Sequence, residues 1–260
     1  MTKTAVIAGQ GPLAGIIATS LDDVSIYALQ GFAPEGLTST PFRLERLVPL
    51  VEELTAAGVS RVVFAGAVQR PPLDPEAFDP RTASLVPRMV MAIQSGDDAA
   101  LRELAAIFEE SDLPVVGAQE IVPQLVPDEG VLCGEIAPRA RKDADRAAEI
   151  LALTGTLDIG QGCVVAGGLC LAIETLPGTK AMLDFVAATR RGTGGVFYKA
   201  PKAGQDLRFD MPVIGPETVA QAAAANLSGI AWQAGGVMML DRDATVAAAE
   251  AAGIFLWANA

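Results

Sequence analysis

Lysines, aspartates and an arginine crowd one short segment of the chain. Residues 199–210 read Lys-Ala-Pro-Lys-Ala-Gly-Gln-Asp-Leu-Arg-Phe-Asp. The cations Lys199, Lys202 and Arg208 can neutralise a pyrophosphate. Asp206 and Asp210 can hold a divalent cation or orient a water molecule. The segment therefore predicts phosphate chemistry, and the alternative is a solvated loop whose ion pairs contribute little.

The absence of one residue type narrows the chemistry further. The 260 residues include no histidine. This excludes Ser-His-Asp hydrolysis, zinc held by histidine and a histidine general base. The remaining groups are carboxylates, lysines and backbone dipoles, and Mg²⁺ is the cation that suits carboxylates together with phosphates.

A glycine-rich turn near the start of the chain is the second candidate site. It follows a predicted strand, opens a predicted helix and has the Gly-x-Gly-x-x-Ala spacing, so it could contact a nucleotide or a phosphate. Its candidate contacts are Gly9, Gln10, Gly11 and Leu13. A nicotinamide-dependent oxidoreductase would need an acidic residue after the second strand, where this chain has Gln30. The glycines could equally do no more than permit the turn.

Weaker candidates lie at other predicted turns and helix starts. Residues 66–72 follow the third predicted strand, so in a parallel sheet they share a rim with the glycine turn. The aspartates after Gly96, the Gly-Gln-Gly run at residues 160–162 and the Gly-Thr pair after Pro177 stand where a helix cap or a turn explains them as well as a phosphate contact does. The candidates from these segments are Gly66, Gln69, Arg70, Asp97, Gln161, Gly178 and Thr179.

Strand and helix signals alternate along the chain and predict an α/β protein of two domains. The first half favours a Rossmann-like parallel sheet with strands at residues 4–8, 24–29, 61–64 and 114–116. Residues 120–141, rich in proline, glycine and charge, suit a linker. We therefore expect an N-terminal domain at 1–134 and a second α/β domain at 135–260, in which a helix at 142–153 precedes a strand-turn-strand unit at 160–173.

Bulk properties restrict partners and location. A formal charge of -12 argues against nucleic acid. No stretch approaches the roughly 18 to 20 apolar residues of a membrane span, and no signal peptide is indicated, so we expect a cytoplasmic protein. Three cysteines are too irregularly spaced for a zinc site, and we expect core thiols in a reducing compartment: Cys133, Cys163 and Cys170.

Four segments read together resemble the LpxI family of UDP-2,3-diacylglucosamine pyrophosphatases, which act in lipid A biosynthesis of Gram-negative bacteria. They are residues 7–11, 66–71, 96–98 and 199–215, the last being the most specific. The resemblance implies Mg²⁺-dependent hydrolysis to UMP and 2,3-diacylglucosamine 1-phosphate, with water attacking the sugar-side phosphorus. It also implies two family-specific domains with the substrate between them.

One departure from the family bears on the metal. The family commonly shows Glu-Gly-Thr-Asp where this chain has Pro-Gly-Thr-Lys at residues 177–180. Asp206 and Asp210 therefore become the expected Mg²⁺ ligands, one binding metal while the other orients water, and Lys199 and Lys202 neutralise the leaving UMP. Transient contact with the inner membrane surface is expected of an enzyme with a lipid product. The alternative is a nucleotide-sugar or lipid carrier without catalysis, and the sequence leaves self-association open.

Overall fold

The chain forms two compact α/β units. The computed structural model describes residues 2–68 and 72–260. Unit 1 comprises Met1–Pro123 with the separate segment Arg208–Asp210, and unit 2 comprises Gln124–Leu207 and Met211–Ala260. The position expected for the boundary, near residue 135, lies inside unit 2, because the strand at Gly130–Cys133 pairs with the last strand of the chain.

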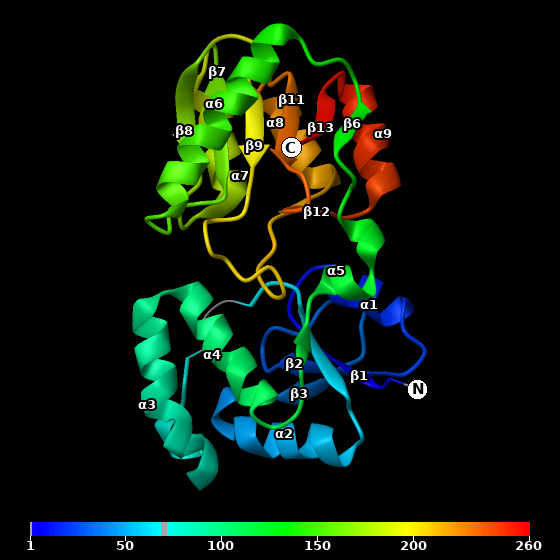
Figure 1. Cartoon of the computed structure of the whole chain (residues 1–260), viewed down its shortest axis with the longest axis vertical. Coiled ribbons are helices and arrows are strands. Elements are labelled where there is room, and N and C mark those ends of the chain that lie inside the picture. Colours follow the sequence, from blue (N-terminus) through cyan, green and yellow to red (C-terminus); the bar gives the residue numbers. More distant parts are fainter. Residues whose placement is uncertain (1, 69–71) are drawn as a thin grey trace. The chain divides into compact units, whose positions relative to one another are not determined.

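Unit 1 is built on a five-stranded parallel sheet in the order β3-β2-β1-β4-β5 (Figure 1). This is the order of the first five strands of a Rossmann fold, with the switch point between β1 and β4. The strands are β1 (Thr4–Ala8), β2 (Val24–Leu29), β3 (Thr40–Phe42), β4 (Arg61–Ala65) and β5 (Val115–Val116). All five residues of β1 are buried, as expected for the central strand of a parallel sheet that is covered on both faces.

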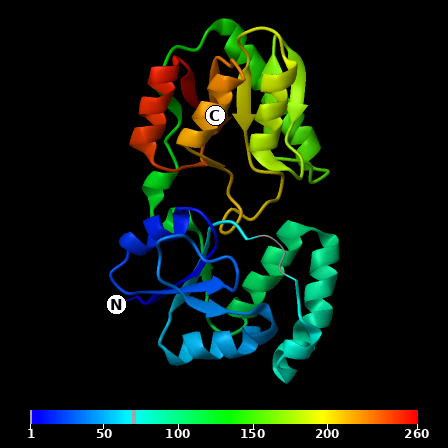
Figure 2. The same cartoon turned by 180° about the vertical axis from the view of Figure 1, so that it is seen from behind.

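Five helices accompany this sheet. They are α1 (Leu13–Thr19), α2 (Leu47–Ala56), α3 (Pro80–Ser95), α4 (Asp97–Glu109) and α5 (Ala118–Ile121), with 3-10 turns at Leu44–Arg46, Pro75–Ala77 and Pro123–Leu125. Helices α3 and α4 lie side by side as a hairpin (Figure 2). The chain reverses between them at Gly96, whose φ of 124° favours glycine. Asp79 caps α3 by accepting from the amides of Arg81 and Thr82.

A buried carboxylate, Glu45, fixes the entry to α2. It accepts hydrogen bonds from the guanidinium of Arg43 (Nη2 to Oε1, 3.0 Å) and from the amide of Asp74 (2.8 Å). These bonds, the one from Arg43 above all, hold the pKa of Glu45 at about 2 although burial opposes the shift. Glu45 therefore stabilises unit 1 only while it is ionised.

We expect this contribution to vanish in acid. Because the folded pKa is depressed, the stabilisation is complete above the ordinary carboxyl pKa of 4.5 and is lost as the pH falls towards about 2. Since the Arg43 partner is partly exposed, the loss should be about 2 kcal/mol. Urea unfolding of the wild type and Glu45→Gln between pH 6 and pH 2 measures it. The difference between the two proteins should shrink as the pH falls, and a constant difference would contradict this account.

Unit 2 contains a six-stranded mixed sheet in the order β6-β13-β11-β9-β7-β8 and a two-stranded sheet of β10 and β12. The strands are β6 (Gly130–Cys133), β7 (Gly162–Ala166), β8 (Leu169–Ile173), β9 (Val196–Lys199), β10 (Val213–Ile214), β11 (Gly229–Gln233), β12 (Met238–Met239) and β13 (Phe255–Asn259). Strands β9, β11 and β13 run parallel, and β7 is antiparallel to both β8 and β9. The carboxyl ends of β8, β9, β11 and β13 therefore meet at one edge of the sheet.

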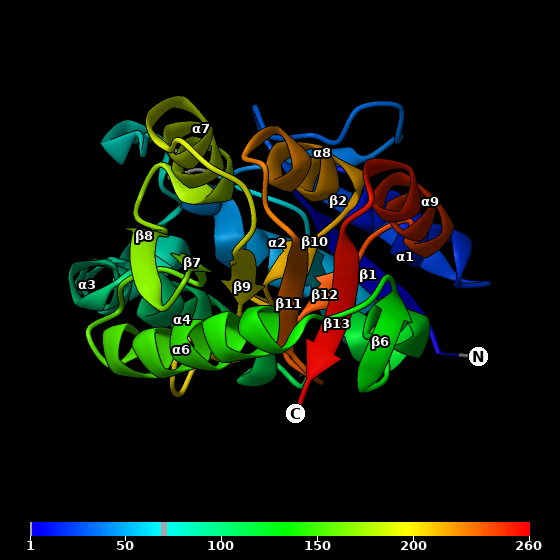
Figure 3. The ribbon, with the colours of Figure 1, turned by 90° about the horizontal axis from the view of Figure 1, so that it is seen from above.

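Helices cover both faces of this larger sheet. They are α6 (Pro138–Gly155), α7 (Gly178–Thr189), α8 (Pro216–Ala224) and α9 (Arg242–Ala252). Helix α6 packs on one face, and α7, α8 and α9 on the other (Figure 3). Among the helices of the described residues, none is both long and apolar enough to cross a bilayer.

Two local expectations for unit 2 need correction. The segment 120–141 is no structureless linker, because it contains β6, the antiparallel partner of β13, and the start of α6 at Pro138. Cys133 and Cys163 are core thiols as expected, but Cys170 is exposed because it lies on β8, the edge strand. The strand-turn-strand unit predicted at 160–173 is confirmed as β7 and β8.

Candidate functional site

The glycine turn after β1 and the loop after β4 meet at the switch point of the unit 1 sheet. Gln10 and Ala67 exchange two backbone hydrogen bonds of 2.8 and 2.9 Å, so the two loops form an antiparallel bridge. A Cβ on Gly9 would lie 2.6 Å from the oxygen of Ala67, and one on Gly66 would lie 2.7 Å from the backbone of Gly9 and Gln10. The shared rim predicted from the sequence is therefore present.

This geometry explains the glycines without a ligand. Gly9 and Gly66 are required by the close backbone approach, and Gly11 by its φ of 96°. Helix α1 has seven residues, and Leu13 at its start is buried. The dinucleotide-cofactor interpretation thus loses its main support. The candidates Gln69 and Arg70 lie outside the described residues.

The end of the polar loop belongs to unit 1. Arg208 donates to Glu109 at the end of α4 (Nη1 to Oε1, 2.6 Å) and to the carbonyl of Val115 in β5 (3.2 Å). The ring of Phe209 meets that of Phe64, in β4, edge-on at 6.2 Å between centroids. Asp210 follows directly and is half-buried. Two anchored neighbours therefore fix the backbone of Asp210 on the β4–β5 side of unit 1.

Lys199 is the buried cation of unit 2. It is the last residue of β9, and only 6% of its surface is exposed. Its ammonium donates to the hydroxyl of Thr179 (2.8 Å) and to the carbonyl of Val213 (3.1 Å). A buried lysine needs such acceptors, because an unsolvated ammonium is costly. The structure thus brings together two of the predicted site residues, Lys199 and Thr179.

A third member of this cluster, Glu174, was missed from the sequence. The hydroxyl of Thr179 donates to Glu174 Oε1 at 3.1 Å. Glu174 directly follows β8, and Gly178 and Thr179 are the first residues of α7. The available signal was an acidic residue at the end of a predicted strand, four positions before a Gly-Thr helix start. Ligands of open α/β sheets bind outside such strand ends.

The other polar residues of the loop have different partners within unit 2. The ammonium of Lys202 pairs with Asp158, which follows α6, and the backbone amide of Lys202 donates to the side-chain oxygen of Gln205 (N to Oε1, 2.8 Å). Asp206 is half-buried and belongs to unit 2, whereas Asp210 belongs to unit 1. The backbone oxygen of Gln161 accepts from the amide of Ala200 (2.9 Å). The three cations predicted to act together therefore contact different residues. Lys199 contacts Thr179, Lys202 contacts Asp158 and Arg208 contacts Glu109.

The aspartates at residues 97 and 98 open α4. The sequence suggested an aspartate as the helix cap, but the cap is Gly96, because Asp97 is already the first helical residue. The side chain of Asp97 lies outside the described part of the structure. Asp98 pairs with Arg102 one turn later, so its charge stabilises the start of the helix.

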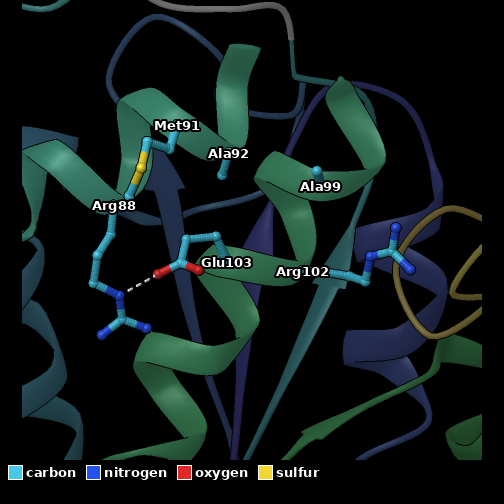
Figure 4. A pocket seen from close by; sticks show the side chains of 6 residues that line it. All are labelled: Arg88, Met91, Ala92, Ala99, Arg102 and Glu103. Carbon is cyan, nitrogen blue, oxygen red and sulfur yellow. Dashed lines mark ion pairs between the residues drawn. The ribbon is translucent and has the colours of Figure 1, made fainter. Parts of the chain in front are cut away.

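A pocket of about 360 Å³ lies between α3 and α4 (Figure 4). Arg88 and Glu103 form an ion pair in its wall (Nε to Oε1, 2.6 Å). Its lining residues are Arg88, Met91, Ala92, Ala99, Arg102 and Glu103. Among the proposed site residues that the structure describes, none lines this pocket, so it adds no support to the predicted chemistry.

The described residues include no group of three or more histidine, cysteine, aspartate or glutamate side chains that could hold a metal ion. In proteins, Mg²⁺ is usually bound through one or two carboxylates together with waters and substrate phosphates. Asp206 and Asp210 supply hard oxygen donors of that kind. The donor set therefore fits a Mg²⁺ ion that depends on the substrate for part of its coordination.

The two α/β units, one of them Rossmann-like, define a two-domain α/β protein with a buried lysine at the carboxyl end of a strand in its larger sheet. Its family follows from comparison with known proteins. The LpxI N-terminal domain matches residues 3–125, and the LpxI C-terminal domain matches residues 128–257. The chain is also 36% identical over 272 aligned residues to the UDP-2,3-diacylglucosamine pyrophosphatase LpxI of Caulobacter vibrioides, covering 98% of this chain and 97% of that protein. The chain belongs to the LpxI family.

Proposed function

We propose that this chain hydrolyses the pyrophosphate bond of UDP-2,3-diacylglucosamine and releases UMP and 2,3-diacylglucosamine 1-phosphate. The observation that carries the proposal is the near-complete alignment, at 36% identity, with a protein named for this activity. Both domains of the family are present, in their order along the chain. The absence of histidine agrees with a mechanism built on carboxylates, lysine and metal.

Within this proposal, Lys199 is the group that meets phosphate in unit 2. Its ammonium is held at the carboxyl end of β9 by Thr179 and Val213, so its position does not depend on the substrate. A preorganised cation in a site with little water stabilises charge that develops on a leaving phosphate oxygen. Thr179 stands at the start of α7, where the helix dipole adds positive potential.

The proposal includes Mg²⁺ held by Asp206 or Asp210. When bound, the ion would supply charge neutralisation to the pyrophosphate and polarise its phosphorus towards attack. The carboxylate that does not hold metal would accept a proton from the attacking water and orient it. Asp206 and Asp210 lie four residues apart in one loop, so their Cα atoms can be at most about 14 Å apart.

We also propose that the protein works in the cytoplasm and touches the inner membrane surface transiently. The three cysteines are free, which suits a reducing compartment. Substrate and product carry two acyl chains, which partition into a bilayer. Leu176, beside Glu174 and Thr179 in the chain, has 97% of its surface exposed and could enter a lipid surface.

Incubation of the purified protein with UDP-2,3-diacylglucosamine, with and without Mg²⁺, tests the function. We expect UMP and the lipid monophosphate in equal amounts when Mg²⁺ is present, and loss of turnover after EDTA that added Mg²⁺ restores. Turnover unaffected by EDTA would contradict the metal role alone. Saturable binding of substrate without cleavage in the presence of Mg²⁺ would favour a carrier instead.

A further inference from the structure

Three polar side chains from different parts of unit 2 form a directional hydrogen-bonded chain. Lys199 Nζ donates to Thr179 Oγ1 at 2.8 Å, and Thr179 Oγ1 donates to Glu174 Oε1 at 3.1 Å. A threonine hydroxyl has a single proton. Since the proton goes to Glu174, the lone pairs of Thr179 are left to accept from Lys199. The carboxylate therefore fixes the direction of the hydroxyl, and the hydroxyl fixes the ammonium.

The two glycines of the Gly160-Gln161-Gly162 segment make room for Glu174. A Cβ on Gly162 would lie 2.6 Å from Glu174 Oε2 and 2.8 Å from the ring of Phe197. A Cβ on Gly160 would lie 2.0 Å from the backbone oxygen of Glu174. The amide of Glu174 also donates to the oxygen of Gly162 at 2.7 Å. The sequence suggested that this segment contacts phosphate. In the structure, its glycines leave the space that Glu174 occupies.

The second oxygen of Glu174 carries a cost that the fold does not explain. Oε2 is buried and has no hydrogen-bond partner among the described residues. An unsatisfied buried acceptor typically destabilises a protein, more so when it is charged. An apolar residue would avoid the cost if Glu174 served packing alone. The charge itself is thus the property that calls for a role, and the nearest group that uses it is the Thr179–Lys199 pair.

We propose that Glu174 is a positioning residue of the active site, which acts through Thr179 to hold the Lys199 ammonium where a phosphoryl oxygen of the substrate binds. The inference rests on the proposed function for its catalytic consequence. Its structural half, that Glu174 and Thr179 immobilise Lys199, stands on the contacts alone. Glu174 touches neither substrate nor metal in this account.

Substitutions at Thr179 and Glu174 separate positioning from packing. Thr179→Val keeps the shape and removes the hydroxyl, and it should lower kcat by roughly 10- to 100-fold with a smaller change in KM. Thr179→Ser keeps the hydroxyl and should retain most of the activity. Glu174→Gln keeps an acceptor for Thr179 but removes the charge, and it should lower kcat by about tenfold. Thr175→Val, at an exposed neighbour, and Glu250→Gln, at an exposed position of α9, are the matched controls and should stay within about twofold.

A second measurement does not depend on activity. In protein labelled with ¹⁵N on lysine, the hydrogen-bonded Lys199 ammonium should give an N–H signal protected from solvent exchange, absent in Lys199→Met and broadened in Thr179→Val. If the wild type cleaves substrate while folded Thr179→Val and Glu174→Gln match it in kcat, the inference is overturned. If the wild type fails to cleave, the proposed function fails, and an ammonium signal unchanged in both variants would sink the positioning claim separately. Should Thr179→Val not fold, Glu174→Gln decides by the same two readouts.

Discussion

Asp210→Ala should lower turnover by roughly a thousandfold while leaving substrate affinity nearly intact, the upper end of what losing one charge-stabilising group costs. In the proposal, Asp210 either binds Mg²⁺ or orients the attacking water. Both roles stabilise the transition state more than the bound substrate. Its backbone is set by two anchored neighbours, Arg208 on Glu109 and Phe209 on Phe64. Initial rates and equilibrium binding of uncleaved substrate, measured on the same preparation, check the expectation.

Comparison with a second aspartate assigns the roles. Asp206→Ala, in the same loop but in unit 2, should also reduce turnover. The aspartate whose replacement is compensated by a higher Mg²⁺ concentration is the metal ligand. Asp22→Ala, at an exposed turn of unit 1, is the control for the loss of one negative charge. Full activity in both folded loop variants would show that the loop aspartates take no part in the reaction.

The fold could be predicted where the signal is local. Apolar, β-branched runs between glycine turns mark both ends of a strand. They predict the strands at residues 4–8 and 24–29 and the pair of strands within 160–173. β6 was missed because its pairing with β13, more than a hundred residues away, leaves no periodic pattern in a four-residue strand. β3 and β12 were also missed, because strands of three and two residues are too short to show an alternating pattern.

The candidate site residues likewise fall into those that could be predicted from the sequence and those that could not. The rim shared by Gly9 and Gly66 was predicted because parallel strands bring their carboxyl ends together. By contrast, the assignment of Arg208 and Phe209 to unit 1 depends on contacts with Glu109 and Phe64, far apart in sequence. The role of Gly162 as a seat for Glu174 could not be predicted either, because a glycine pattern does not reveal which group fills the space that it leaves.

Gly9→Ala should destabilise unit 1 by about 1 to 3 kcal/mol, although alanine is the smallest possible addition. The new Cβ would lie 2.6 Å from the oxygen of Ala67 and 2.8 Å from the carbonyl carbons of Ala67 and Gly66. These are backbone atoms, which cannot rotate away as a side chain can. The bridge between Gln10 and Ala67 must therefore open or shift. Urea unfolding followed by fluorescence and circular dichroism measures the change.

Gly15→Ala supplies a control of opposite sign six residues further along. Gly15 lies inside α1, and a Cβ there meets no atom within 4 Å. Because alanine favours a helix over glycine, the variant should be more stable than the wild type by roughly 0.5 to 1 kcal/mol. Both changes add one methyl group to the same turn-helix segment, so composition and hydrophobicity cannot account for a difference in sign. If Gly9→Ala were as stable as Gly15→Ala, the close backbone approach at the switch point would be wrong, and the glycine turn would again be available to a phosphate.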